Sequence, residues 1–245
     1  MVSYVKKSTA KALADFDDNQ EDGCFVHAYS RKIGSNPEIN SQQLHAVCLD
    51  VFAAGMETTT TTISWAVLYI AAHQQDKVRE EILRVVGHDR LPSMADRQSM
   101  PYTTAVIHEI QRCANILQTN VNRRTTDAVE IMGHLIPVDT CVIGEIHQIM
   151  AHDPIFVDPK AFRPERYLNE DGRTLNKEVV DRTVAFSLGK RQCAGEGLAR
   201  VELFLGLSAT LQHYRLFPCD SYGPVDLEPE NSSMTAKRQP LRIVP

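Results

Sequence analysis

The first half of the chain has the hydrophobic spacing of helices. A long helix is expected to begin at Asn40, because Asn40 and Gln43 have the spacing of a capping box. Nothing in the sequence interrupts this helix before about Gln75, so it would run for roughly thirty residues, far beyond the average helix. Shorter helices are predicted over residues 24–33, 76–86, 102–113 and 195–213.

The second half of the chain has a mixed pattern. Residues 116–142 contain short β-type runs, which are separated by turn residues that include Asp127 and Gly133. Residues 153–185 combine prolines and glycines with little periodicity, which predicts an ordered but irregular loop. Short strands are expected after the last helix. The predicted fold class is therefore mainly α with small β-sheets.

The composition is that of an ordinary soluble globular protein. Of the 245 residues, 43% are hydrophobic and 23% are charged, and the formal net charge is −5. This balance argues against a broad nucleic-acid surface, so no nucleic-acid partner is expected. Residues 1–18 lack the apolar core of a signal peptide, and the apolar stretch 47–72 is interrupted by Asp50, Glu57 and a run of threonines. We therefore predict no membrane anchor in this sequence.

The six cysteines are spread singly along the chain, and no two have the C-x-x-C spacing. The absence of this spacing excludes a zinc ribbon and a redox motif, and the low density of cysteines along the chain argues against a disulfide framework. A reducing, cytosol-facing location fits best. The nine histidines also show no metal-ligand spacing.

The strongest chemical signal surrounds Cys193, in the run F-S-L-G-K-R-Q-C-A-G from Phe186 to Gly195. Gly189 and Gly195 permit a tight loop that can approach a flat ligand closely. Cys193 is at the entry to a helix, whose N–H groups and dipole stabilise a thiolate. Arg191 is placed to meet an anionic group beside a metal. Taken alone, Cys193 could be a buried free cysteine, but the five fixed positions together favour a metal ligand.

A second motif, A-G-M-E-T-T, lies in the long helix. Thr58 follows Ala54 by four residues, so its hydroxyl can bond that carbonyl and bend the helix, with Gly55 easing the distortion. An acid and a hydroxyl, here Glu57 and Thr58, are the groups that proton delivery needs. The alternative is a helix with exposed threonines.

The pattern E-x-x-R occurs twice, at Glu81–Arg84 and at Glu109–Arg112. It is a weak pattern, expected about once by chance in a chain of this length. The first pair lies on an amphipathic helix, and we interpret it as a solvated i,i+3 pair.

In this order along the chain, the motifs resemble those of the cytochrome P-450 family, most closely its microsomal animal members that oxidise xenobiotics and lipids. The resemblance implies that residues 41–245 form the haem-binding C-terminal part of a P-450 domain, whose N-terminal half is absent, and that residues 1–40 form a leading segment with a short helix. It places the structural E-x-x-R pair at Glu109 and Arg112, with Arg166 as their partner.

The resemblance also implies a haem-thiolate site. Heme b would be ligated through iron by the Cys193 thiolate, with Glu57 and Thr58 as the catalytic acid–alcohol pair. Arg123 falls where the family often has a basic residue for a haem propionate, although an exposed strand arginine is an equal alternative. The other residues implied to contact haem are Phe186, Gly189, Arg191 and Gly195, and those implied to contact substrate are Val51, Ala54, Gly55, Ile116, Val121 and Met234.

The implied activity is that of a monooxygenase, which inserts one oxygen atom from O2 into a lipophilic substrate such as a xenobiotic, fatty acid or steroid. Electrons would come from NADPH through NADPH–cytochrome P-450 reductase, with cytochrome b5 as a further candidate partner. The implied full-length protein is at the cytosolic face of the endoplasmic reticulum membrane, whereas a chain without an anchor would be cytosolic. Two alternatives stay open: a haem-binding module that does not oxygenate, and a truncated, inactive fragment that acts through protein contacts.

Overall fold

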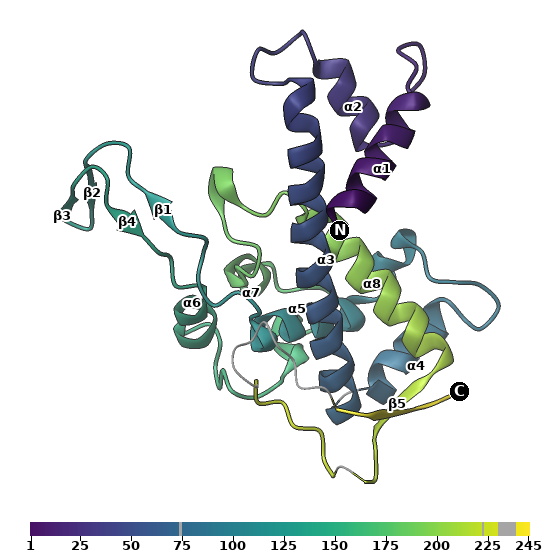
Figure 1. Ribbon diagram of the computed structural model, residues 1–245. Coiled ribbons are helices and arrows are strands. Elements are labelled where there is room, and N and C mark those ends of the chain that lie inside the picture. Colours follow the sequence, from purple (N-terminus) through teal and green to yellow (C-terminus); the bar gives the residue numbers. More distant parts are fainter. Residues whose placement is uncertain (74, 222, 230–238) are drawn as a thin grey trace. The chain divides into compact units, whose positions relative to one another are not determined.

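The structure of the chain is a computed structural model, which describes residues 1–73, 75–221, 223–229 and 239–245. The described chain is mainly helical with small antiparallel sheets (Figure 1), which confirms the predicted fold class. It divides into two compact units, residues 1–58 and 59–245, and each is described by itself. This division falls inside the long helix, whereas the sequence analysis divides the chain between residues 40 and 41.

The first unit consists of helices. Their bounds are α1 (Val2–Ala14), α2 (Phe25–Lys32) and the leading part of α3 (Ser41–Ala72). α1 packs against α2, and the His27 ring bonds the Ala12 carbonyl at 2.9 Å. The amide of Gln43 donates to the Asn40 side chain at 3.1 Å, so Asn40 caps α3 as predicted.

The sequence analysis did not find α1. Only Val5 and Thr9 of this helix are buried, so the segment lacks the regular apolar repeat from which a helix is recognised. Its alanines and lysines are good helix formers, and these intrinsic preferences support the helix instead.

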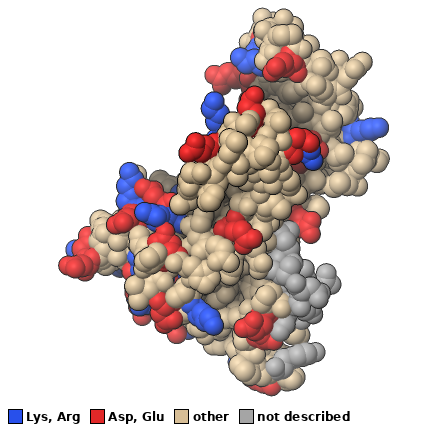
Figure 2. Space-filling view, turned by 90° about the vertical axis from the view of Figure 1, so that its left-hand side faces the viewer, with Lys and Arg blue, Asp and Glu red and all other residues tan. Residues whose placement is uncertain are grey.

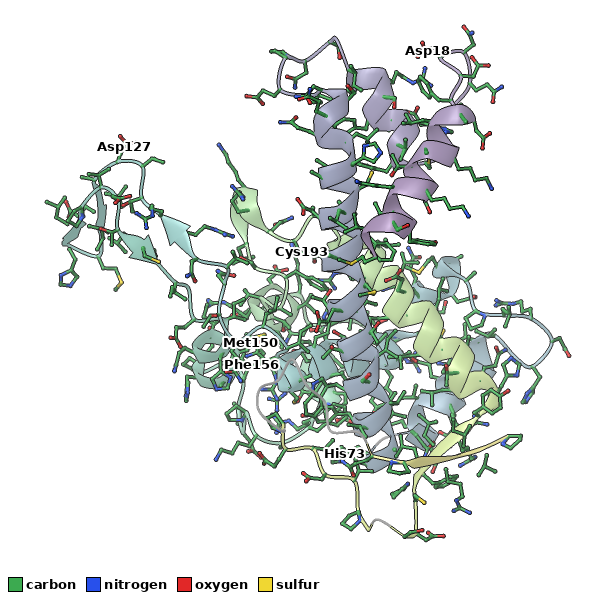
Figure 3. The ribbon with its side chains drawn as sticks, viewed as in Figure 1. Asp18, His73, Asp127, Met150, Phe156 and Cys193 are labelled. Atoms are coloured by element: carbon green, nitrogen blue, oxygen red, sulfur yellow. The ribbon has the colours of Figure 1, made fainter. Side chains whose placement is uncertain are left out.

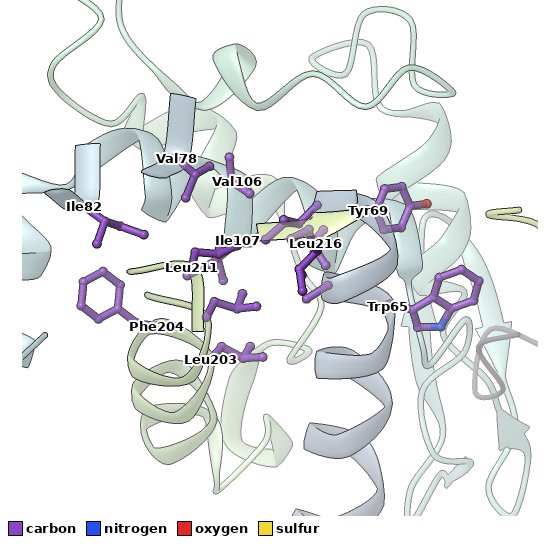
Figure 4. Packing of buried hydrophobic residues seen from close by; sticks show 14 of the residues in the cluster. Trp65, Tyr69, Val78, Ile82, Val106, Ile107, Leu203, Phe204, Leu211 and Leu216 are labelled. Carbon is purple, nitrogen blue, oxygen red and sulfur yellow. The ribbon is translucent and has the colours of Figure 1, made fainter. Parts of the chain in front are cut away.

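The second unit is built around three helices and the end of α3. The bounds of these helices are α4 (Gln75–Val85), α5 (Pro101–Ala114) and α8 (Glu196–His213). Figure 4 shows their apolar side chains meeting in one core, to which α3 contributes Trp65 and Tyr69. α5 is central, because every residue from Tyr102 to Arg112 is buried. It can therefore hold polar groups away from water.

The N-terminus of α5 is closed by a side chain of α4. The Glu81 carboxylate accepts the Tyr102 amide at 3.0 Å, and it accepts both the amide and the hydroxyl of Thr103, at 2.6 and 2.7 Å. Glu81 is buried. The interpretation of Glu81–Arg84 as a solvated pair was therefore wrong for Glu81. Its carboxylate accepts hydrogen bonds from the first amides of a neighbouring helix.

The remaining elements are short. The sheets are antiparallel pairs: β1 (Arg123–Arg124) with β4 (Cys141–Val142), β2 (Val129–Ile131) with β3 (His134–Ile136), and β5 (Arg215–Pro218) with β6 (Leu241–Val244). Two helices were not predicted from the sequence: α6 (Ile146–His152), which comes just before the irregular region, and α7 (Lys177–Arg182), which lies inside it. The irregular region also contains the 3₁₀ segment Pro164–Tyr167. Another 3₁₀ segment, Met94–Ser99, precedes α5.

Acidic and basic side chains are interspersed on the face drawn in Figure 2. Among the described residues, no helix combines the length and the apolarity that a membrane span requires.

Candidate functional site

The loop before α8 presents a cysteine to solvent. The amide of Cys193 donates to the Phe186 carbonyl at 2.9 Å, which closes the loop on itself. Ser187 and Gly189 both have positive φ, at 64° and 81°, so the chain turns sharply between these two points. Cys193 is exposed, and Figure 3 labels it just before α8. The thiol is therefore accessible and close to a helix N-terminus.

Two glycines of the cysteine loop leave open space where a side chain would otherwise stand. A Cβ placed on Gly189 would meet nothing within 4 Å, and one placed on Gly195 would meet only the Cys193 sulfur, at 3.9 Å. An exposed soft sulfur donor in a loop with two such glycines would fit a flat macrocycle whose metal takes a thiolate ligand. Among the described residues, no group of three or more His, Cys, Asp or Glu side chains is placed to hold a metal ion. A ligand set of that type is therefore not formed by the described chain.

Two predicted cations belong to this second unit. Arg191 lies on the 3₁₀ segment Gly189–Arg191 of the loop and is exposed. Arg123 lies on β1, opposite Val142 of β4, and is half-buried.

A third arginine, which the sequence analysis did not single out, ties the loop to α8. The Arg200 guanidinium lies 5.3 Å from the centre of the Phe186 ring and 2.7 Å from the Glu196 carboxylate. The i,i+4 spacing of Glu196 and Arg200 was the available sequence signal. Together they hold the first residue of the cysteine loop against the helix that follows it.

The acid–alcohol pair lies on α3, in the first unit. The Thr58 hydroxyl donates to the Ala54 carbonyl at 2.7 Å, the bond that the four-residue spacing predicts. Thr58 is half-buried, and Glu57 is exposed. A Cβ on Gly55 would meet nothing within 4 Å, so this face of the helix is open.

The residues predicted to contact substrate have different environments. In the first unit, Val51, Ala54 and Gly55 are all exposed on α3. In the second unit, Ile116 packs on the core, whereas Val121 is 73% exposed. Met234 lies outside the described residues.

The predicted structural trio lies in one buried ion-pair network. Arg112 bonds both oxygens of the Glu109 carboxylate, with Nε at 2.8 Å and Nη2 at 2.9 Å, and Arg166 Nε bonds Oε1 at 3.1 Å. The carboxylate also accepts the Arg163 amide at 2.9 Å. Burial by itself would lower the pKa of Arg112, but the hydrogen bonds to Glu109 outweigh this effect and raise the pKa above its ordinary value. All three members of the trio are therefore joined through the Glu109 carboxylate.

The two arginines hold the end of α6 and the irregular region by their backbone carbonyls. Arg112 donates to the carbonyls of Met150 and Ala161, at 3.2 and 3.4 Å. Arg166 donates to those of Val157, Asp158 and Ala161, at 2.8, 3.1 and 3.2 Å. Figure 3 labels Met150 and Phe156 in this region. The network thus gives hydrogen-bond partners to a segment that has little regular structure of its own.

The comparisons with known proteins show the family of this chain. A family model described as "Cytochrome P450" matches residues 2–244. The chain is 38% identical to cytochrome P-450 2E1 of Oryctolagus cuniculus over 98% of this chain and 50% of that protein. It is 42% identical to cytochrome P-450 2D20 of Mesocricetus auratus, over 75% of this chain and 37% of that protein.

A further relative is cytochrome P-450 2C28 of Mesocricetus auratus, 37% identical over 94% of this chain and 48% of that protein. The chain therefore spans half or less of the length of these curated relatives. A family model that matches nearly every residue, together with relatives at this identity, establishes the family. The chain belongs to the cytochrome P-450 family.

Proposed function

We propose that this chain forms the haem-thiolate part of a monooxygenase that inserts one oxygen atom from O2 into a lipophilic substrate. The observation that carries the proposal is the exposed thiol of Cys193, presented beside two glycines by a closed loop. Family membership supports haem as the ligand of this loop. Arg191 and Arg123 are the cations proposed for the propionates.

Cys193 would hold heme b as the thiolate ligand of its iron. The N-terminus of α8 follows Cys193 within three residues, and its amides and dipole favour negative charge on a nearby sulfur. When bound, the haem supplies the activation of dioxygen, which an electron-rich thiolate favours by promoting O–O cleavage.

Glu57 and Thr58 would deliver protons. The bond to Ala54 fixes the orientation of the Thr58 hydroxyl, and the exposed Glu57 carboxylate can exchange protons with water. A hydroxyl and a carboxylic acid are groups that can pass protons to a reacting centre.

The exposed residues Val51, Ala54 and Gly55 of α3 support a lipophilic substrate, since their side chains offer no polar group. Ile116 and Val121 are proposed as substrate contacts from the second unit. In the whole protein, we propose that electrons come from NADPH through NADPH–cytochrome P-450 reductase, with cytochrome b5 as a further partner. We propose the cytosolic face of the endoplasmic reticulum membrane as its location.

The test is a spectrum of the 245-residue chain with added haem. We expect the reduced carbonyl complex to show the red-shifted Soret band of a thiolate-ligated iron, because Cys193 supplies the sulfur. The variant Cys193→Ser should lose this band. The matched control Cys141→Ser removes another exposed cysteine and should retain it. Retention of the band in Cys193→Ser would overturn the assignment.

A second candidate is a chain that binds haem weakly and does not turn over by itself. Large apolar side chains are exposed in each unit, including Val51 at 59%, Met56 at 52% and Leu198 at 64%. Each Å² of apolar surface left in water costs roughly 25 cal/mol, which lowers the stability of the isolated chain. We expect substoichiometric haem and no NADPH-dependent oxidation of lipophilic probes with added reductase. Stoichiometric haem with steady turnover would exclude this candidate.

A further inference from the structure

Two arginines precede two threonines at the end of β1. The sequence reads Arg123-Arg124-Thr125-Thr126, and the chain bends at Thr126 before it enters β2. Thr126 is exposed, and Figure 3 labels its neighbour Asp127 in this bend. A hydroxyl two and three residues after a pair of guanidinium groups is a pattern that an acidic binding groove can recognise, because guanidinium forms bidentate bonds with carboxylates.

Hydrogen bonds distinguish the two hydroxyls. Thr125 donates its hydroxyl to the Pro137 carbonyl at 2.7 Å and accepts the Thr140 amide at 2.9 Å, so it is held in the hairpin from both sides. Thr126 donates only to the carboxylate of the adjacent Asp127, at 3.2 Å and in an exposed position. The Thr126 hydroxyl can therefore bind another molecule without the loss of a contact between strands.

Arg124, the second arginine of the pair, is also available to a binding partner at low cost. β1 is two residues long and pairs only with β4, through Arg123↔Val142 and Arg124↔Cys141. Arg124 bonds Asp139 at 2.5 Å, but both side chains are mostly exposed, at 65% and 71%. Exposed ion pairs contribute little to stability, so a binding partner with several carboxylates can replace Asp139.

We propose that Thr126 is a phosphorylation site for a protein kinase that recognises paired arginines on the N-terminal side of its target. The γ-phosphoryl group of ATP would be transferred to Thr126 Oγ1. The bond between the γ-phosphorus and the β-bridging oxygen breaks, and ADP leaves. The Thr126 hydroxyl proton passes to a catalytic carboxylate of the kinase.

The phosphate would change the charge of this bend. At neutral pH it adds about 1.5 to 2 negative charges, next to the Asp127 carboxylate and two residues from the Arg124 guanidinium. Arg124 would exchange its exposed bond with Asp139 for a stronger one with the phosphate. Asp127 opposes the modification, because it is a like charge and holds the hydroxyl.

The experiment uses the full 245-residue chain without haem, so its outcome does not depend on the proposed oxygenase function. The chain is incubated with ATP and the catalytic subunit of an arginine-directed protein kinase, and the phosphorylated residues are identified by mass spectrometry. We expect phosphate on Thr126. Thr174 is the internal control, because it is an exposed threonine that follows a single arginine, Arg173.

Four variants test the assignment. Thr126→Ala should abolish incorporation at the bend, whereas Thr125→Ala should leave it at Thr126. Arg124→Ala should lower the initial rate about tenfold or more, since at least one charge-assisted contact to the kinase is lost. Asp127→Asn should raise the rate. Phosphate at Thr174 but not at Thr126, unchanged rates in Arg124→Ala, or no incorporation at the bend would overturn the proposal.

Discussion

The two E-x-x-R motifs have the same spacing on two helices that pack against each other, yet they do different things. On α5, Glu109 and Arg112 are both almost fully buried and share two short hydrogen bonds. On α4, the Arg84 side chain is 66% exposed and lies 3.9 Å from Glu81. Glu81 instead uses both oxygens to bind the start of α5.

The difference shows that the motif is defined by what surrounds it. Glu109 becomes the centre of a network because Arg166, 57 residues later, reaches the same carboxylate. Glu81 becomes a helix cap because it lies three residues after the buried Val78 and just before the buried Ile82, on the apolar face of α4. In both motifs the glutamate is buried, and only the arginine differs in exposure.

The largest effect is expected for Arg112→Lys. Lysine keeps the charge but cannot form the planar two-point bond with Glu109 while it holds the carbonyls of Met150 and Ala161. Breaking a buried pair of this kind costs about 3–5 kcal/mol. Urea unfolding of the two proteins would measure the loss. A change below 1 kcal/mol would mean that the network contributes little to the fold.

Glu81→Ala should have the next largest effect. It leaves the buried amides of Tyr102 and Thr103 without their acceptor, which costs about 1–3 kcal/mol. The matched control is Glu80→Ala, which removes an exposed acid from the same helix. If the two variants unfold at the same urea concentration, Glu81 does not stabilise the start of α5.

Lowering the pH should reduce the free energy of unfolding through His108, which lies on α5. Burial lowers the pKa of His108 from 6.5 to about 3, with smaller contributions from Arg200 and Arg97. Below pH 6.5 the unfolded chain binds a proton at His108 that the folded chain does not bind. The contribution of the neutral, buried His108 to stability is therefore present above that pH and is lost as the pH falls towards 3. The loss is about 1.4 kcal/mol per pH unit.

The measurement is the free energy of unfolding between pH 7 and 4.5, a window set by the shifted pKa of His108. His108→Phe should flatten the decline, whereas replacing the exposed His213 should not. α4 contains no histidine. An identical pH profile for His108→Phe would contradict the prediction.

Arg84→Lys should have the smallest effect, within about 0.5 kcal/mol. Its guanidinium is mostly in water and is not needed for the cap that Glu81 forms. This variant is also the matched control for Arg112→Lys. Equal losses at the two positions would show that the position of the arginine in the fold is irrelevant, and the comparison would fail.

Much of the fold was readable from local patterns. The capped start of α3, the bond from Thr58 to Ala54, and the hairpin turn at Gly133 all depend on residues within four positions of each other. The helix α1 was missed because it buries too little to produce an apolar repeat. The short helices α6 and α7 were missed because they have only seven and six residues, too few to show a period.

The sequence by itself determined the family, through the cysteine loop and the order of the motifs, because a tight loop with a fixed cysteine needs only neighbouring residues. The family resemblance also proposed Glu109, Arg112 and Arg166 as partners, but their buried geometry and the helix cap that Glu81 forms were decided by the tertiary structure. Glu81 meets Thr103 across 22 residues and Glu109 meets Arg166 across 57. The same four-residue pattern cannot encode such partners, because burial and hydrogen-bond geometry at these distances arise only when separate helices pack together.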